Sequence, residues 1–338
     1  MAYPFTCSIY CTTRCENLCR HCKVRSPFPG DASFNNVAQV LTQANNLGCR
    51  YVDLTGGNPL LVDWLPDALM LCNKFGLTSS LSVSGAMIAE RMKQWGTDWL
   101  NFPGILRFSI DGNPDFHDAN RGPDNYLHTV AGLEVASRVT QKGRIQIVFS
   151  AIPGSNGNIN RDQLSSVLYL ARKSGVLVNV NPLFGASLSS AEIQDLIWFG
   201  KQSGIQMSRG KLRFLLRGGN NQYNPTCQAV RSVITVTPDN KLAVPCYYHQ
   251  ELAIPIGNDL RLALNSWERK RYLALDGRHD FCQGCSIWCY IVPSFLYHCH
   301  NRAVTWLHGL SGLQEVRDCL LRFAGQFHHC HPYPDFSE

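Results

Sequence analysis

The sequence predicts an α/β fold, a partial (β/α)6 TIM barrel followed by a small α+β domain. Up to residue 205, six short apolar runs alternate with segments of helical periodicity, which implies a parallel sheet with right-handed crossovers. The alternation stops after six units, whereas a closed eight-fold barrel takes about 250 residues. After Gly204 the pattern changes to short β-like runs. We therefore expect a barrel over 1–205, a second domain over 206–290 and a helical tail over 291–338.

The expected elements follow the chain in order. Helix 35–47, for example, carries apolar residues at helical spacing and ends before Gly48. The expected barrel strands are 5–12, 51–55, 79–84, 105–110, 144–150 and 176–181. The expected barrel helices are 35–47, 61–75, 86–95, 124–139, 160–173 and 189–203. For the C-terminal part we expect β-like runs at 212–216, 232–236 and 241–244, a turn at 238–240, and helices at 267–275 and 308–324.

Composition narrows the function classes. The chain has 338 residues, of which 45% are hydrophobic and 17% charged, so it should bury a sizeable core. A net charge of +6 without Lys/Arg runs gives no reason to expect a nucleic-acid partner or a polybasic membrane surface. No stretch approaches the ~20 apolar residues of a transmembrane helix. The start of the chain lacks a signal-peptide pattern, so we expect a reducing, cytoplasmic location.

Cysteine is unusually frequent, with fifteen residues, and Cys15, Cys19 and Cys22 lie within eight positions. A loop of this length can give one thiolate to each of three irons of a cubane cluster, which leaves the fourth iron open to a small molecule. A closed structural zinc site requires four ligands. Three reduced cysteines in a loop, or part of a zinc site, are the alternatives.

The spacing C-x3-C-x-φ-C, with His21 at the φ position, resembles the signature of the radical S-adenosylmethionine (SAM) enzymes. The resemblance implies a [4Fe–4S] cluster whose open iron chelates the amino and carboxyl groups of SAM. An electron from the cluster then breaks the S–C5′ bond and gives a 5′-deoxyadenosyl radical. The resemblance also implies an electron donor of the flavodoxin or ferredoxin type.

Residues at the ends of the expected strands extend the resemblance. Gly56-Gly57-Asn58-Pro59 resembles the family's GGEP loop, and Val83-Ser84-Gly85 resembles its TNG. The run from Ser109 to Gly122 resembles the family's S-x-DG…HD..RG. Asn58 stands where the family has Glu, so an amide replaces a charged partner of the SAM amine. The implied cofactor-binding residues are His21, Gly56, Gly57, Asn58, Pro59, Ser84, Ser109, Asp111, Arg121, Ser150 and Asn179. For each of them, a strand-end cap or turn is the alternative.

Five more cysteines follow in the C-terminal third, at Cys227, Cys246, Cys282, Cys285 and Cys289. A cysteine at each end of a hairpin and a C-x2-C loop can converge on one metal centre. This arrangement resembles the twitch or SPASM extension of radical SAM enzymes. It implies one auxiliary [4Fe–4S] cluster on Cys227, Cys246, Cys282 and Cys285, with Cys289 as a rival ligand and a closed zinc site as the alternative.

The remaining cysteines and histidines are interpreted structurally. His298-Cys299-His300 and His328-His329-Cys330-His331 can bind metal, but a packing segment and a frayed end are the favoured interpretation. The other cysteines should be ordinary buried thiols; they are Cys7, Cys11, Cys49, Cys72 and Cys319.

These observations leave three functional hypotheses. The first is a radical SAM enzyme that abstracts hydrogen from a small molecule or natural product, with the auxiliary cluster assisting the oxidation. A peptide substrate is less favoured because only fourteen residues precede Cys15, too few for a winged-helix leader-binding domain. The second is a radical transfer or C–C coupling enzyme, because Pro245-Cys246-Tyr247 and the late cysteines also resemble adenosylhopene synthase, which acts on a lipid alkene. The third is a non-catalytic Fe–S scaffold, supported only by Asn58.

Overall fold

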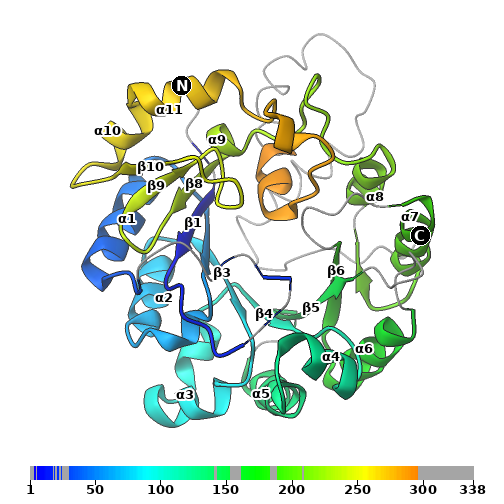
Figure 1. Cartoon of the computed structure of the whole chain (residues 1–338). Coiled ribbons are helices and arrows are strands. Elements are labelled where there is room, and N and C mark those ends of the chain that lie inside the picture. Colours follow the sequence, from blue (N-terminus) through cyan, green and yellow to red (C-terminus); the bar gives the residue numbers. More distant parts are fainter. Residues whose placement is uncertain are drawn as a thin grey trace.

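The computed structural model describes residues 4, 6–17, 19, 21–22, 24, 30–140, 143–152, 161–182, 189–207 and 209–295. The strands within these residues form one ten-stranded sheet in the order β10-β9-β8-β1-β2-β3-β4-β5-β6-β7. Figure 1 shows the barrel strands curving around the centre of the molecule, with helices along their outer side. The expected α/β fold with a partial barrel is therefore confirmed.

The elements have the following bounds. The strands are β1 Thr6–Tyr10, β2 Tyr51–Thr55, β3 Thr78–Val83, β4 Ile105–Ser109, β5 Ile145–Ala151, β6 Leu177–Pro182, β7 Ile205–Gln206, β8 Val233–Val236, β9 Lys241–Val244 and β10 Leu252–Pro255. The α-helices are α1 Phe34–Asn46, α2 Leu65–Lys74, α3 Ile88–Trp95, α4 Pro114–Arg121, α5 Asn125–Val139, α6 Arg161–Ser174, α7 Ser190–Gly200, α8 Arg209–Leu216, α9 Ala229–Ser232, α10 Leu260–Asn265 and α11 Trp267–Ala274. Three 3-10 helices are η1 Pro59–Leu61, η2 Asp98–Asn101 and η3 Asp280–Cys282, and residues 288–295 are also helical.

Parallel pairing joins β1 to β7 in chain order, as the alternation of strands and helices predicts. The short strand β7 extends the six expected strands by one. The C-terminal hairpin is continuous with this sheet, because β8 pairs parallel with β1 while β9 and β10 continue it antiparallel. The hairpin strands and the barrel strands consequently belong to one sheet, although the hairpin comes more than halfway along the chain.

Local sequence explains where the helices begin. Ser33 caps α1 by accepting a hydrogen bond from the Asn36 backbone, and Ser189 with Glu192 forms a capping box at α7. The sequence analysis did not predict α4. It begins because Asn113 accepts a hydrogen bond from the Phe116 backbone, and Pro114 occupies the first turn, where its missing N–H costs nothing.

The expected β-like run at 212–216 is wrong, because these residues lie in α8. Lys211, Phe214 and Leu215 are buried, and their i, i+3, i+4 spacing suits one side of a helix. The strand β10 and the helix α10 were also missed. The runs at 232–236 and 241–244, the turn at 238–240 and the helix at 267–275 are confirmed.

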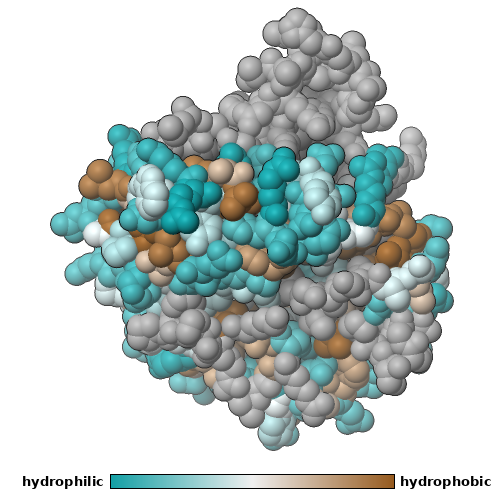
Figure 2. All heavy atoms as spheres, turned by 45° about the horizontal axis from the view of Figure 1, so that its top comes forward, coloured by the Kyte–Doolittle hydropathy of each residue, from teal (hydrophilic) through white to brown (hydrophobic). Residues whose placement is uncertain are grey.

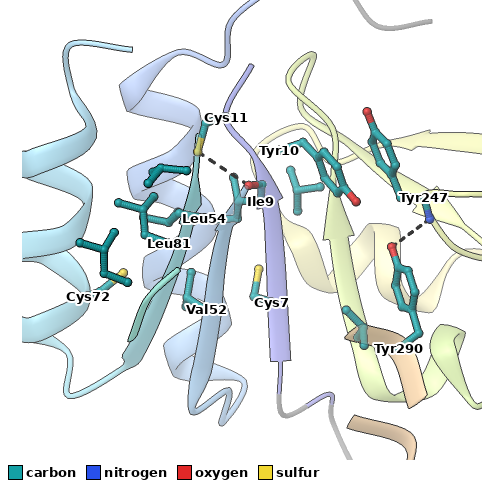
Figure 3. Packing of buried hydrophobic residues seen from close by; sticks show 14 of the residues in the cluster. Cys7, Ile9, Tyr10, Cys11, Val52, Leu54, Cys72, Leu81, Tyr247 and Tyr290 are labelled. Atoms are coloured by element: carbon teal, nitrogen blue, oxygen red, sulfur yellow. Dashed lines mark hydrogen bonds between the residues drawn. The ribbon is translucent and has the colours of Figure 1, made fainter. Parts of the chain in front are cut away.

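The core lies between the sheet and the helices. Alternate residues of β2, β3, β4 and β6 are buried, and the residues between them are mostly half-buried. Figure 3 shows part of this core, where Cys7, Val52 and Leu81 pack beside β1 and its neighbours. Cys7, Cys11, Cys49 and Cys72 are all fully buried, which confirms them as ordinary core thiols.

The segment after the hairpin packs against both parts of the chain. The Phe214 ring of α8 lies 6.1 Å from Trp288 and 6.0 Å from Phe295. On the other side, the Tyr247 backbone donates to the Tyr290 hydroxyl at 3.0 Å. The helical residues 288–295 therefore lie between α8 and the hairpin strands.

On the face that Figure 2 views, hydrophobic side chains are scattered among hydrophilic ones. Within the described residues, every helix is too short or too polar to span a bilayer. The expected helix 308–324, Cys319 and both His/Cys tracts of the tail lie outside the described residues.

Candidate active site

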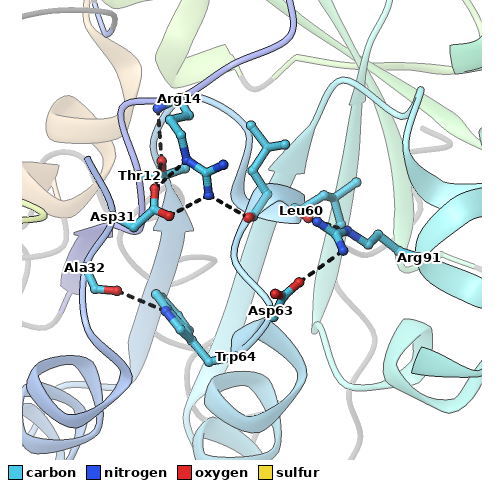
Figure 4. Close-up of polar contacts among 9 residues, drawn as sticks. Thr12, Arg14, Asp31, Ala32, Leu60, Asp63, Trp64 and Arg91 are labelled. Atoms are coloured by element: carbon cyan, nitrogen blue, oxygen red, sulfur yellow. Dashed lines mark hydrogen bonds and ion pairs between the residues drawn. The ribbon is translucent and has the colours of Figure 1, made fainter. Parts of the chain in front are cut away.

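The cysteine loop, residues 15–22, follows β1 at its carboxyl end, and an ion pair fixes its base (Figure 4). The Arg14 guanidinium donates to Asp31 at 2.8 and 2.5 Å and to the Leu61 carbonyl at 2.8 Å. Thr12 donates to Asp31 at 2.6 Å and accepts from the Arg14 backbone at 2.9 Å. Burial opposes ionisation of Asp31, but Arg14 and Thr12 together lower its pKa. The loop therefore starts from a fixed position beside η1.

The glycines of the GGNP loop allow this loop to press against the base of the cysteine loop. Gly57 N donates to Thr12 O and Asn58 N donates to Arg14 O, both at 2.8 Å. A Cβ at Gly56 or Gly57 would collide with these same two carbonyl oxygens, and Gly56 has φ +138°. Close packing of two backbones thus requires both glycines. Their contact with SAM stays a prediction.

A carboxylate of the cysteine loop reaches the ends of the next two strands. Asn58 Nδ2 donates to Glu16 Oε1 at 2.7 Å, and the Ser84 hydroxyl donates to the same oxygen. Asn58 is fully buried, and its Oδ1 caps η1 by accepting from Leu60 N at 3.2 Å. Two of the predicted cofactor-binding residues, Asn58 and Ser84, therefore converge on a residue that the sequence analysis did not single out.

The next residue of the loop is anchored through a buried amide chain. Asn125 Nδ2 donates to Asn17 Oδ1 at 2.6 Å, and Asn125 Oδ1 lies 2.8 Å from His117 Nε2. The Asp111 backbone donates to His117 Nδ1 at 3.2 Å, so the proton of the neutral ring is on Nε2. Burial lowers the pKa of His117, which favours this neutral form. His117 is thus an orienting residue beneath the loop.

Arg121 anchors the second cysteine. Its guanidinium binds the fully buried Asp111 carboxylate through two hydrogen bonds of 2.7 and 3.0 Å, and donates to Cys19 Sγ at 3.6 Å. Burial opposes ionisation of Asp111, yet the Arg121 charge lowers its pKa. Burial likewise raises the pKa of Cys19, and the Arg121 charge partly offsets this. The predicted pair Asp111 and Arg121 therefore links the end of β4 to a cysteine.

Further predicted residues line the concave side of the sheet. All three are half-buried: Ser109 ends β4, Ser150 is the last but one residue of β5, and Asn179 lies in the middle of β6 rather than at its end. Polar side chains dominate this side, including Asp53, whose Oδ1 accepts from Ser80 at 2.5 Å and lies 3.8 Å from Arg107 Nη1. The binding roles of Ser109, Ser150 and Asn179 stay predictions.

The five late cysteines, here the C-terminal cysteine group, lie near one another. Burial is the main cause that raises the pKa of Cys246 and of Cys282 to about 12, and nearby thiols add to it. Burial also raises the pKa values of Cys227 and Cys285, and the charge of Cys285 raises the pKa of Cys227 further. These cysteines are thus close enough for one thiolate to disfavour another.

One buried amide organises this group. Asn220 Oδ1 accepts from Cys227 N at 2.8 Å, while Nδ2 donates to the carbonyls of Gly277 at 2.9 Å and Cys282 at 3.0 Å. The Asn220 backbone donates to Cys285 O at 3.0 Å. Asn220 is fully buried and ties the segment of Cys227 to the C-x2-C loop of Cys282 and Cys285.

Cys289 differs from the other four. Its side chain is exposed, yet burial is the main cause that raises its pKa, followed by the charges of Asp53 and Cys246. Since Asp53 lies on β2, the Cys289 thiol is near this barrel strand. Cys289 therefore lies between the cysteine group and the barrel.

Comparison with known proteins identifies the family. Residues 9–162 match the family model described as the radical SAM superfamily. Residues 9–162 of this chain are therefore similar to the radical SAM domain of that superfamily. A curated relative, the AdoMet-dependent heme synthase of Nitratidesulfovibrio vulgaris, is 28% identical over 132 residues, which cover 36% of this chain and 34% of the relative. A second heme synthase, from Oleidesulfovibrio alaskensis, is 26% identical over 130 residues, with 36% of this chain and 32% of the relative covered. The alignments thus span about a third of these relatives' length.

Solved structures of radical SAM proteins share the fold. SuiB of Streptococcus suis, bound to its precursor peptide SuiA, has a TM-score of 0.64 at 12% identity, with 86% of this chain and 71% of SuiB covered. The protein anSMEcpe with bound AdoMet has a TM-score of 0.60 at 14% identity, with 89% of this chain and 98% of that chain covered. At these identities the likeness concerns the fold alone.

The family implies a [4Fe–4S] cluster and SAM, and the cysteine loop fits the cluster. In the described part of the chain, no three His, Cys, Asp or Glu side chains are arranged to hold a single metal ion. His21 Nδ1 is buried without a hydrogen-bond partner among the described residues, and burial lowers the pKa of His21. A buried nitrogen without a hydrogen-bond partner in the described protein, within the same loop as the three thiols, suits a site that binds a cofactor.

Sequence reasoning missed four anchoring residues, which are Glu16, Asn17, Asn125 and Asn220. The first two lie inside the cysteine motif at its variable positions, so only their polarity could have pointed to them. Asn220 lies in a polar stretch that resembles any loop. Its role depends on partners that are distant in sequence, of which Cys285 is 65 positions away.

Proposed function

We propose that this protein cleaves SAM reductively and uses the 5′-deoxyadenosyl radical to abstract hydrogen from a polar small molecule. The observation that carries the proposal is the anchoring of the cysteine loop. Glu16, Asn17 and Cys19 are each held by side chains from a different part of the barrel. A loop fixed at so many points keeps its thiolates in one arrangement, which a redox cofactor with an open position requires.

The protein's own residues would perform the following work. When bound by Cys15, Cys19 and Cys22, a [4Fe–4S] cluster would supply the electron that breaks the S–C5′ bond of SAM. Arg121 favours the thiolate of Cys19, because its charge offsets part of the effect of burial. The neutral His117 and Asn125 keep Asn17 oriented. Ser109, Ser150 and Asn179 offer hydrogen bonds to the ribose or to the substrate.

The concave side of the sheet favours a polar substrate over a lipid alkene. Asp53, Ser80 and Arg107 form a polar layer there, and Ser150 and Asn179 continue it. Burying a hydrocarbon against such groups without hydrogen bonds would be unfavourable. This lining supports oxidation of a small molecule and speaks against transfer of the radical to a lipid.

We further propose that the C-terminal cysteine group binds one auxiliary [4Fe–4S] cluster, as in twitch-type enzymes. Cys227, Cys246, Cys282 and Cys285 are the proposed ligands, because Asn220 ties Cys227 to the loop of Cys282 and Cys285, and Cys246 lies near Cys285. A cluster with four thiolates would accept the electron that the substrate radical loses, while the proton goes to solvent or a nearby base. A closed zinc site is the alternative, and metal analysis distinguishes the two.

A peptide substrate is the second candidate. It is favoured by the fold likeness to SuiB bound to a precursor peptide and to anSMEcpe bound to the Cp18Cys peptide. A peptide would present polar backbone groups to the same concave side.

The test is an anaerobic assay with reconstituted, reduced protein. SAM is added with polar-metabolite, lipid or peptide fractions of a host extract, and mass spectrometry follows the adenosyl group. We expect 5′-deoxyadenosine above background with the polar fraction, together with a metabolite two hydrogens lighter, and none from a Cys22→Ala control. An adenosyl adduct in the lipid fraction would establish the transfer reaction instead. A peptide product would establish the second candidate, and intact SAM throughout would overturn the proposed function.

A further inference from the structure

We infer that Glu16 supplies the carboxylate that binds the amino group of SAM, and that Asn58 and Ser84 serve to position it. The inference rests on the proposed function, because it concerns how this chain binds the molecule it cleaves. Three segments that are distant in sequence meet at this carboxylate: the cysteine loop, the turn after β2 and the turn after β3.

Two donors fix one oxygen of the carboxylate. Asn58 Nδ2 lies 2.7 Å from Glu16 Oε1, and the Ser84 hydroxyl donates to the same atom. Asn58 Nδ2 is also 3.2 Å from Ser84 Oγ, so the three groups form a closed cluster. Among the described residues, both hydrogen bonds to this carboxylate end on Oε1. Glu16 is exposed, which leaves Oε2 accessible to a ligand.

Glu16 lies at the edge of the proposed cluster site. It directly follows Cys15, the first cysteine of the loop. A molecule bound beside the cysteine loop would meet an anionic group that is already oriented.

The chemistry of the three residues assigns their roles. A carboxylate that accepts from an amine N–H forms a charge-assisted hydrogen bond, which is roughly twice as strong as one between two neutral groups. Asn58 is neutral, fully buried, and engaged at both ends of its amide, with Leu60 N on Oδ1 and Glu16 on Nδ2. Asn58 therefore suits a positioning role, and Glu16 suits the ionic one.

The test measures binding rather than turnover. Reconstituted full-length protein is titrated with SAM and with the SAM analogue that lacks the amino group, by calorimetry and by the EPR signal of the reduced protein. We expect the wild type to prefer SAM, because the amino group would bind both the open iron and Glu16. Glu16→Gln should reduce this preference by roughly ten- to a hundredfold, the range of one charge-assisted hydrogen bond, while the exposed helical control Glu90→Gln should keep it in full. The exchange Glu16→Asn with Asn58→Glu returns a carboxylate to the cluster and should regain part of the preference.

The outcomes separate the two claims. If the wild type does not bind SAM, the proposed function and this inference both fail. If the wild type binds SAM and the analogue equally, the inference fails and the proposed function stands, and this result needs no variant to fold. If Glu16→Gln keeps both its iron and the wild-type preference, the inference is likewise overturned.

Discussion

The two cysteine regions are built differently. In the cysteine loop, side chains make the anchors: Glu16, Asn17 and Cys19 each contact a polar side chain of the barrel. In the C-terminal cysteine group, the main chain is held instead, because Asn220 binds backbone groups of Cys227, Cys282 and Cys285.

This difference has a functional meaning. Anchoring by side chains brings charged groups, such as Glu16 and Arg121, next to thiols that a ligand can approach. Anchoring by the main chain holds the backbone of the cysteines and brings no charged side chain to them through these contacts. We therefore interpret the cysteine loop as the region that receives SAM and the C-terminal group as a closed electron carrier.

The largest expected effect separates the two regions by function. Cys22→Ala should abolish SAM cleavage, whereas Cys282→Ala should keep SAM cleavage and lose substrate oxidation. Each variant should fall from about eight to about four irons per chain, because each loses one cubane. Iron analysis and 5′-deoxyadenosine formation check both expectations. Loss of SAM cleavage in Cys282→Ala as well would show that the regions do not act separately.

A second variant tests the main-chain anchoring without removing a cysteine. Asn220→Ala leaves one buried N–H and two buried carbonyls without their partners. Each unsatisfied group should lower the free energy of unfolding by about 1–3 kcal/mol. We expect loss of about half the iron, with faster hydrogen exchange in 277–285 than in the barrel helices. The exposed Asn224→Ala is the matched control. Full iron content in Asn220→Ala would contradict the assigned role.

A third test concerns the buried ion pair beneath the cysteine loop. Arg121→Met leaves the Asp111 carboxylate, which is fully buried, without its cation and should reduce the free energy of unfolding by about 3–5 kcal/mol. Asp111→Asn combined with Arg121→Met should be less destabilised than the sum of the single changes, because no charge remains buried. Denaturant unfolding of the four proteins gives the coupling energy. Additive effects would show that the pair does not act as a unit.

The smallest expected effect concerns a buried lysine between β6 and the helical residues 288–295. Lys211 is buried, donates to Val180 O at 2.7 Å and Asn181 Oδ1 at 2.6 Å, and lies 5.0 Å from the Trp288 ring. Burial lowers the pKa of Lys211 to about 7, well below its value in an unfolded chain. Between these two pKa values the unfolded state binds the extra proton, so stability rises with pH.

We therefore expect the wild type to gain up to ~1.4 kcal/mol per pH unit, relative to Lys211→Met, as the pH rises above about 7. Below the folded pKa both states are protonated, and the difference between the two proteins should no longer change. Denaturation at pH 7 and pH 9 measures this, with the exposed Lys201→Met as control. Parallel pH profiles for wild type and Lys211→Met would contradict the account.

Much of the fold could be predicted from local patterns. Strands β1–β6 lie where the apolar runs are, within about two residues, because periodicity is a local property. The helix α8 was missed, because the short run that includes Phe214 and Leu215 fits a strand or a helix equally well. The helix α4 was missed because its sequence is mostly polar and only its Asn113 cap and Pro114 mark its start.

The candidate site was predictable only in part. The spacing of Cys15, Cys19 and Cys22 is a local motif, and it indicates a cluster directly. The partners of Glu16 are not local, since Asn58 is 42 and Ser84 is 68 positions away. The sequence analysis therefore treated Asn58 as a loss of charge, whereas the fold brings a carboxylate beside it from another segment.

The most direct test of the difference between the two regions is EPR spectroscopy of the reduced, reconstituted protein before and after SAM is added. Two double variants isolate the signals. The first, Cys282→Ala with Cys285→Ala, keeps only the cysteine-loop cluster. The second, Cys19→Ala with Cys22→Ala, keeps only the cluster of the C-terminal cysteine group. We expect SAM to change the signal of the first variant and to leave that of the second unchanged. A SAM-dependent change in the second variant, or none in the first, would contradict the central claim.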